Sequence, residues 1–195
     1  MTGQTIERFL HGFDDPGGHA RPPVHLWTPG EVRDIGLRIA VDGGWWHDGA
    51  PITRRRLVRL FASILRREDD GEHYLVTPHE KVRVVVEDAP FLAVEMVVEG
   101  EGGGDQCLGF RTNVGDRLVC DRDHPLEFSR DDRGDGPKPY VLVRYGLRAK
   151  LVRAIYYDLV ELAVFERISG IEQFGVWSSG RFFTMLAGEA LNDIR

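Results

Sequence analysis

The sequence predicts an α+β protein made of two related domains, each an antiparallel, hairpin-rich sheet with one main helix. Short stretches that alternate apolar and polar residues between Gly, Pro and Asp turns predict the strands. Two segments with apolar residues at helical spacing predict one helix per domain. The chain has 195 residues, of which 42% are hydrophobic and 29% are charged, and this composition is typical of a globular protein.

The first 23 residues are predicted to be a flexible lead-in, because they show no sustained apolar period and contain clusters of Asp, Pro and Gly. Ordered structure is expected from Val24. Residues 34–41 then alternate strictly and would place Ile35, Leu37, Ile39 and Val41 on one face of a strand. The Asp42-Gly43-Gly44 turn leads into Trp45-Trp46-His47, so a β-hairpin is expected here.

The main helix of the first domain is predicted to begin after Thr53, which can cap it. Its apolar stripe consists of Leu57, Leu60, Phe61, Ile64 and Leu65. Asp69-Asp70-Gly71 is expected to end it.

The middle of the chain is predicted to be a meander of short strands. Three β-rich segments cover residues 73–77, 81–87 and 91–98, and Pro78 and Pro90 separate them. A Gly-rich loop precedes a further strand at residues 106–112, and a turn at Val114-Gly115-Asp116 precedes another at residues 118–120.

The last third of the chain is predicted to repeat the strand and helix of the first domain. Residues 140–144 read as a strand after a polar loop at 131–139, and a second helix is marked by Ile155, Leu159, Leu162 and Ala163. Residues 174–186 are aromatic and punctuated by glycine, which favours extended structure.

An internal repeat supports this division into two units. A shift of 102 positions aligns Val41 with Val143, Gly44 with Gly146, and the Leu57-Val58-x-Leu60 run with Leu159-Val160-x-Leu162. The length fits one domain or two small ones, and the repeat alone does not decide between them. Together with the family resemblance described below, it predicts an N-terminal domain over residues 24–94 and a C-terminal domain over residues 95–195.

Charge and composition exclude several classes of protein. The net charge of −6 is spread evenly over both halves, which argues against a nucleic-acid-binding arm. No apolar stretch approaches the roughly 18 residues of a membrane span, and no signal peptide is recognisable. Cys107 and Cys120 match no metal or redox motif and are expected to be buried free thiols. These features predict a cytoplasmic protein and leave open whether it forms a homo-oligomer.

The search for chemical motifs yields one secondary candidate and no catalytic residue. Arg54, Arg55 and Arg56 occupy a predicted helix start, where free backbone N–H groups and guanidinium groups would bind an anion such as phosphate. The alternative is an exposed face in a chain whose basic residues are mostly arginine. The histidines match no metal-ligand spacing, Ser178 lacks a nucleophile-elbow setting, and no phosphate-binding glycine loop occurs, so we expect no metal and no cofactor.

Several sequence blocks together resemble a known family. They are Val76-Thr77-Pro78-x-Glu80-Lys81, Val86-Glu87-Asp88-Ala89-Pro90-Phe91, Phe110-Arg111-Thr112-Asn113-x-Gly115-Asp116, and Gly175-Val176-Trp177-Ser178-x-Gly180-x-Phe182-Phe183. Their order resembles the bacterial domain-of-unknown-function family 1285 from about Val24 to Gly188. The resemblance implies a duplicated α+β core whose C-terminal domain is superficially similar to a pleckstrin-homology fold. It also implies a site between the domains for a nucleotide-like ligand and a part in signalling, but it brings no catalytic residues.

Polar residues from these blocks and from the second helix would line such a groove. The candidates are Lys81, Thr112, Asn113, Arg153, Trp177 and Ser178. A cation would meet phosphate, an indole would stack on a base, and small polar groups would orient the ligand. Each also has a local interpretation: Thr112-Asn113 as a turn, Trp177 as a core residue, and Arg153 as a surface charge at a helix start.

The sequence therefore favours a non-enzymatic protein that binds a small anionic ligand. Two other classes stay open. A metal-dependent hydrolase or transferase would use Glu80, Glu87, Asp88 or His124, and a protein-interaction module would present an exposed apolar patch.

Overall fold

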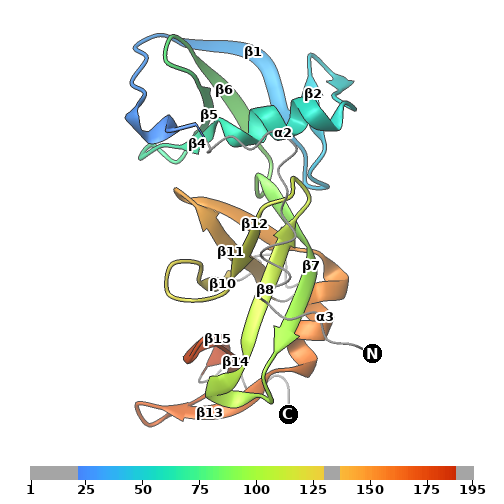
Figure 1. Cartoon of the computed structure of the whole chain (residues 1–195), viewed down its shortest axis with the longest axis vertical. Coiled ribbons are helices and arrows are strands. Elements are labelled where there is room, and N and C mark those ends of the chain that lie inside the picture. The colour runs from blue at the N-terminus through green and yellow to red at the C-terminus, as the bar shows by residue number, and fades with distance from the viewer. Residues whose placement is uncertain (1–21, 130–136, 188–195) are drawn as a thin grey trace.

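The computed structural model describes residues 22–129 and 137–187, and it confirms an α+β fold with one main helix in each domain. Figure 1 shows the two domains stacked along the long axis of the molecule, with α2 in one and α3 in the other. The predicted lead-in at residues 1–23 lies outside the described residues except for its last two positions. The buried apolar side chains of both domains form one continuous cluster, so the domains share a core.

The N-terminal domain is a six-stranded sheet packed on α2 (Arg55–Ser63). A short 3₁₀ helix, η1 (Val24–Leu26), precedes it. In the spatial order of the sheet, the strands are β3 (Ala50–Pro51), β2 (Trp45–His47), β1 (Val32–Ile39), β6 (Lys81–Val86), β5 (His73–Val76) and β4 (Leu65–Arg67). All neighbours are antiparallel except β1 and β6, which are parallel.

Strand β1 confirms only part of the predicted alternation. Leu37 and Ile39 are buried, but Ile35 and Val41 are exposed. The register between β1 and β6 shifts between Arg33 and Leu37, and Gly36 has a φ of +69° there. This bulge breaks the period-2 alternation, and Val41 already belongs to the following turn.

Helix α2 is shorter than the sequence predicts. It begins after Arg54, whose side chain makes no capping hydrogen bond, and Thr53 is therefore not the cap. It ends at Ser63 because the next residues form β4, in which Leu65 pairs with Leu75 of β5. Apolar residues of the predicted stripe thus divide between a helix and a strand.

The C-terminal domain contains a second six-stranded sheet, with a parallel pair between β7 and β12. Its strands, in spatial order, are β10 (Leu126–Ser129), β11 (Lys138–Arg144), β12 (Leu147–Leu151), β7 (Phe91–Glu99), β8 (Cys107–Thr112) and β9 (Arg117–Val119). The 3₁₀ helix η2 (Gly103–Asp105) lies between β7 and β8. The predicted boundary between residues 94 and 95 falls inside β7, whereas the two sheets divide between Val86 and Phe91.

Helix α3 (Arg153–Glu161) and a three-stranded meander complete this domain. The meander contains β13 (Val164–Ile168), β14 (Ile171–Ser178) and β15 (Arg181–Ala187). Hairpin, helix and three strands thus follow one another in both domains. Because α2 begins at Arg55 and α3 at Arg153, the helices are 98 positions apart, and the shift of 102 misaligns them by about one turn.

Candidate functional site

A cleft lies where the turn after β4 faces the tip of the β11–β12 hairpin. Two hollows, of about 390 Å³ and about 400 Å³, share the lining residues Arg67, Glu68 and Asp69. The N-terminal domain contributes the segment from Arg66 to Asp70 and His25, and the C-terminal domain contributes Tyr145 and Gly146. The cleft is therefore shared by the two domains.

The hairpin tip from the C-terminal domain has an unusual residue at its turn. Tyr145 and Gly146 both have positive φ, at 45° and 75°, in a two-residue loop between β11 and β12. Three other two-residue hairpin loops have the same pattern, and their first residues are Asp48, Ser169 and Ser179. Small polar residues suit this left-handed conformation, whereas a bulky tyrosine is strained in it. Such strain at a cleft is a sign of a functional role.

Tyr145 also forms an aromatic pair across the domains. Its ring stacks on His25 with the ring centroids 5.7 Å apart and the planes inclined by 27°. Tyr145 is nevertheless 56% exposed. The cleft thus offers a π surface that water still reaches, and a planar ring can stack on such a surface.

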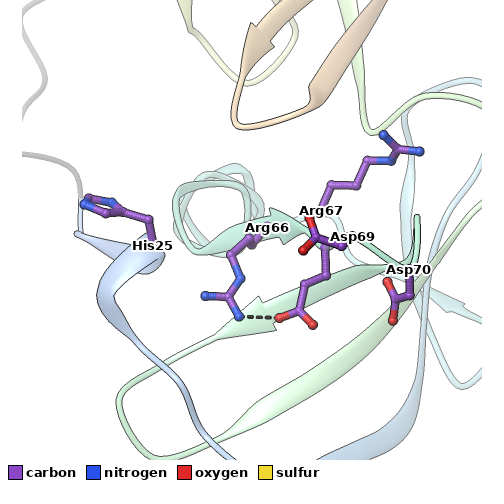
Figure 2. A pocket seen from close by; sticks show the side chains of 6 residues that line it. His25, Arg66, Arg67, Asp69 and Asp70 are labelled. Atoms are coloured by element: carbon purple, nitrogen blue, oxygen red, sulfur yellow. Dashed lines mark hydrogen bonds and ion pairs between the residues drawn. The ribbon is translucent and has the colours of Figure 1, made fainter.

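The floor of the cleft is an ion-pair network centred on Glu68. This carboxylate accepts from Arg66 and Lys81, and the dashed line at Arg66 in Figure 2 marks the first of these bonds. Burial by itself would raise the pKa of Glu68, but the hydrogen bonds from Lys81 and Arg66 outweigh it and hold this pKa below its usual value. Glu68 is therefore ionised and already engaged.

Arg66 connects this floor to η1. Its Nη1 donates to the carbonyl oxygens of Val24 and Trp27, each at 2.8 Å. These bonds hold the segment that carries His25 against β4. Arg66 therefore has a positioning role at the edge of the cleft.

Arg67 lies on the other side of the floor. In Figure 2 its side chain extends away from the Arg66–Glu68 pair. Its Nε donates to the Gly71 carbonyl at 3.3 Å, and among the described residues no carboxylate forms an ion pair with it. A Cβ on Gly146 would lie 3.9 Å from Arg67 Nη1, so the guanidinium reaches the hairpin tip. Terminal guanidinium nitrogens in this setting can bind an anionic group.

The structure does not gather the six predicted site residues in the cleft. Lys81 comes nearest, since it pairs with Glu68 and its Nζ lies 4.1 Å from the centre of the Tyr74 ring. Arg153 is exposed at the first position of α3. Trp177 donates from Nε1 to Glu166 at 3.2 Å.

The other three have local structural roles. Thr112 is buried, and its hydroxyl accepts from the Asp116 N–H at 2.9 Å. Asn113 accepts from the Leu92 N–H at 3.1 Å, close to the turn that carries Gly43. Ser178 is buried, accepting from the Leu108 N–H at 3.0 Å and donating to the Cys120 carbonyl at 2.6 Å.

The secondary candidate and the cysteines also lie away from the cleft. Arg54, Arg55 and Arg56 are exposed at the start of α2, whereas the cleft lies beyond its other end. Cys107 and Cys120 are free thiols, and burial raises the pKa of Cys120 to about 12. Over residues 22–129 and 137–187, no three His, Cys, Asp or Glu side chains are grouped so as to hold a metal ion. In the same ranges no helix has the length and hydropathy needed to cross a bilayer.

Comparisons with known proteins identify the relatives of this chain. Residues 22–89 match the model of the DUF1285 N-terminal domain, described as a domain of unknown function, and residues 90–185 match that of the DUF1285 C-terminal domain. The chain belongs to the DUF1285 family. No curated protein matches it.

Two crystal structures of DUF1285 proteins are similar to it. The one from Silicibacter pomeroyi DSS-3 shares 41% sequence identity, with a TM-score of 0.81, and the match covers 98% of this chain and 100% of that one. The one from Shewanella baltica OS155 shares 34% identity with a TM-score of 0.50, over 65% of this chain and 91% of that one. The DUF1285 domain models meet between residues 89 and 90, in the same linker that separates the two sheets.

The residues that line the cleft are not predicted from the sequence. The sequence predicts Asp69 and Asp70 only as a helix end, and it assigns no role to Tyr145. One signal was available: Tyr-Gly occupies a hairpin tip where Asn-Gly or Asp-Gly would be expected.

Proposed function

We propose that this protein binds a small anionic ligand with a planar ring, of the nucleotide type, in the cleft between its two domains. The observation that carries the proposal is the pairing of an exposed, strained Tyr145 with Arg67, a guanidinium that no described carboxylate neutralises. A ring would stack on Tyr145 while an anionic group binds Arg67.

Binding rather than turnover is the activity that we propose. The cleft takes His25 from one domain and Tyr145 from the other, so a ligand would bridge them and fix their relative position. A protein that changes the coupling of its domains on binding is suited to regulation or signalling.

A thermal-shift screen over nucleotides and phosphorylated metabolites tests the proposal. A ligand present at 100 times its Kd should stabilise the protein by about 2.7 kcal/mol, which raises Tm by several degrees. The Arg67→Gln variant should lose most of this shift, and Arg59→Gln, a matched change of an exposed arginine on α2, should keep it. If no compound shifts Tm, or if Arg67→Gln responds like the wild type, the cleft is not the ligand site.

A further inference from the structure

Most charged groups that line the cleft are already used within the protein. Glu68 accepts from Arg66 and Lys81. Asp70 accepts from the Glu72 N–H and from the Tyr74 hydroxyl, each at 2.9 Å, and these hydrogen bonds lower the pKa of Asp70. Both oxygens of each carboxylate therefore already accept a hydrogen bond within the protein.

Asp69 differs from its two neighbours. It lines both hollows and is exposed, and within the described part of the chain no hydrogen bond or ion pair of its carboxylate is found. The turn that carries Asp69 is held by the backbone instead, through Gly71 N–H to Glu68 O at 2.9 Å and Glu68 N–H to Glu72 O at 3.0 Å. The cleft therefore presents one uncommitted carboxylate beside one guanidinium, that of Arg67, and the exposed ring of Tyr145.

This set of groups selects among planar ligands. An ionised carboxylate only accepts hydrogen bonds, so the ligand edge that faces Asp69 must carry N–H donors, and two adjacent donors fit both carboxylate oxygens. The pairing edge of guanine has two such donors, N1–H and the exocyclic N2 amine. Adenine presents an acceptor beside its amine, and hypoxanthine lacks the amine, so both fit a carboxylate less well.

We infer that the ligand is a guanine nucleotide, with its base edge on Asp69, its ring on Tyr145 and its phosphate on Arg67. The inference rests on the proposed function of the cleft and adds the identity of the base. Asp69 would then determine specificity, while Arg67 and Tyr145 would contribute to the affinity for any nucleotide.

Isothermal titration of the full chain with GMP, IMP and AMP tests the inference. Because hydrogen bonds to a charged group are among the stronger ones, GMP should bind about tenfold or more tightly than either IMP or AMP. Asp69→Asn replaces one acceptor by a donor, so it should abolish the preference for GMP and improve the relative binding of AMP. Asp158→Asn, an exposed change on α3, is the matched control and should leave all three affinities as in the wild type.

The outcomes separate the inference from the proposed function. Equal binding of the three nucleotides, or a GMP preference that survives Asp69→Asn, would overturn the guanine assignment. The proposal that the cleft binds a nucleotide would still stand. Absence of binding by all three would overturn the guanine assignment, and the proposed function would fail as well only if the wider thermal-shift screen also gave no shift. A relative gain for AMP in Asp69→Asn cannot come from misfolding, and it would support the assignment directly.

Discussion

Arg144 and Asp116 form an ion pair that is almost completely buried, since each side chain is only 9% exposed. Arg144 also donates from Nη2 to the carbonyl of Ala62, at 2.8 Å, near the end of α2 in the other domain. The C-terminal end of a helix carries partial negative charge, which favours a cation there. This pair therefore joins the domains directly beside the hairpin tip that enters the cleft.

Breaking this pair should strongly destabilise the protein. Asp116→Leu removes this buried carboxylate from the Arg144 guanidinium, and we expect a loss of about 3–5 kcal/mol in urea unfolding. The double variant Asp116→Leu/Arg144→Leu removes both charges and should be less destabilised than the sum of the single variants. Arg33→Ala, in a pair whose side chains are each 55% exposed, is the control and should cost less than about 1 kcal/mol. Additive losses in the double variant would contradict this account.

His73 should make the protein less stable in mild acid. Burial first, and then the positive charge of Arg67, lower the pKa of His73 from 6.5 to about 4. Between these values the unfolded chain binds a proton at this position and the folded chain does not. The contribution of neutral His73 to the free energy of unfolding is therefore fully present above pH 6.5 and is lost as pH falls toward 4. Because the side chain is partly exposed, we expect about 2 kcal/mol or less.

The comparison of His73→Gln with the wild type measures this effect. The stability difference between the two proteins should change over the interval from pH 7 to pH 4.5, in denaturant titrations at each pH. His79→Gln is the matched control on an exposed turn. A constant difference between wild type and His73→Gln across that interval would show that His73 does not titrate as described.

Gly43 should report on the contact between the domains. It has a φ of +76°, and a Cβ there would lie 2.7 Å from Asn113 Nδ2 and 3.2 Å from Leu92 in the other domain. Gly49 has a φ of +79° with open space around it. Gly43→Ala should therefore cost more than Gly49→Ala, by about 1 kcal/mol or more above the shared backbone strain of about 1 kcal/mol. Equal losses of stability in the two variants would mean that the turn at Gly43 does not pack against the C-terminal domain.

Tyr145→Asn should separate stability from binding. Asparagine tolerates the left-handed conformation, so the variant should gain about 0.5–1 kcal/mol while its nucleotide affinity falls. Ser169→Asn, at the same turn position between β13 and β14, should leave affinity unchanged. If Tyr145→Asn binds as tightly as the wild type, the tyrosine ring does not contact the ligand.

Ser178→Ala should affect the fold and not the ligand. It removes the hydroxyl that accepts from the buried Leu108 N–H, at a cost of about 1–3 kcal/mol, whereas the Cys120 carbonyl keeps the hydrogen bond from the Ser179 hydroxyl at 3.0 Å. Nucleotide affinity of the folded variant should match the wild type. A selective loss of affinity with no loss of stability would restore Ser178 as a ligand-binding residue.

Local patterns predicted the elements of this fold better than its boundaries. The alternation around Leu37 and Ile39 and the apolar run beginning at Leu57 correctly indicated a strand and a helix. The same apolar spacing predicts that Leu65 is helical. Only its pairing with Leu75 shows that it lies in a strand. Tertiary pairing decided this boundary, and a single sequence does not contain that information.

The candidate site was harder to predict for a related reason. Asp69 and Tyr145 are 76 positions apart, and both lie in turns, where no apolar period constrains the structure. Thr112 and Ser178, which the family resemblance suggested instead, are buried, and their hydroxyl groups bond to backbone groups. Only the docking of the domains brings the cleft residues into one place.

The parallel pairing of β1 with β6 sets the order in which the chain can fold during synthesis. The N-terminal sheet needs no residue beyond Val86, so it can close while the second domain is still in the ribosome. Strand β7, in contrast, must wait for β12, about fifty residues later, before its parallel neighbour exists. Because the two domains share one buried cluster, the N-terminal sheet gains its full core only when the second domain packs on it, and the cleft is complete only after β12 has paired.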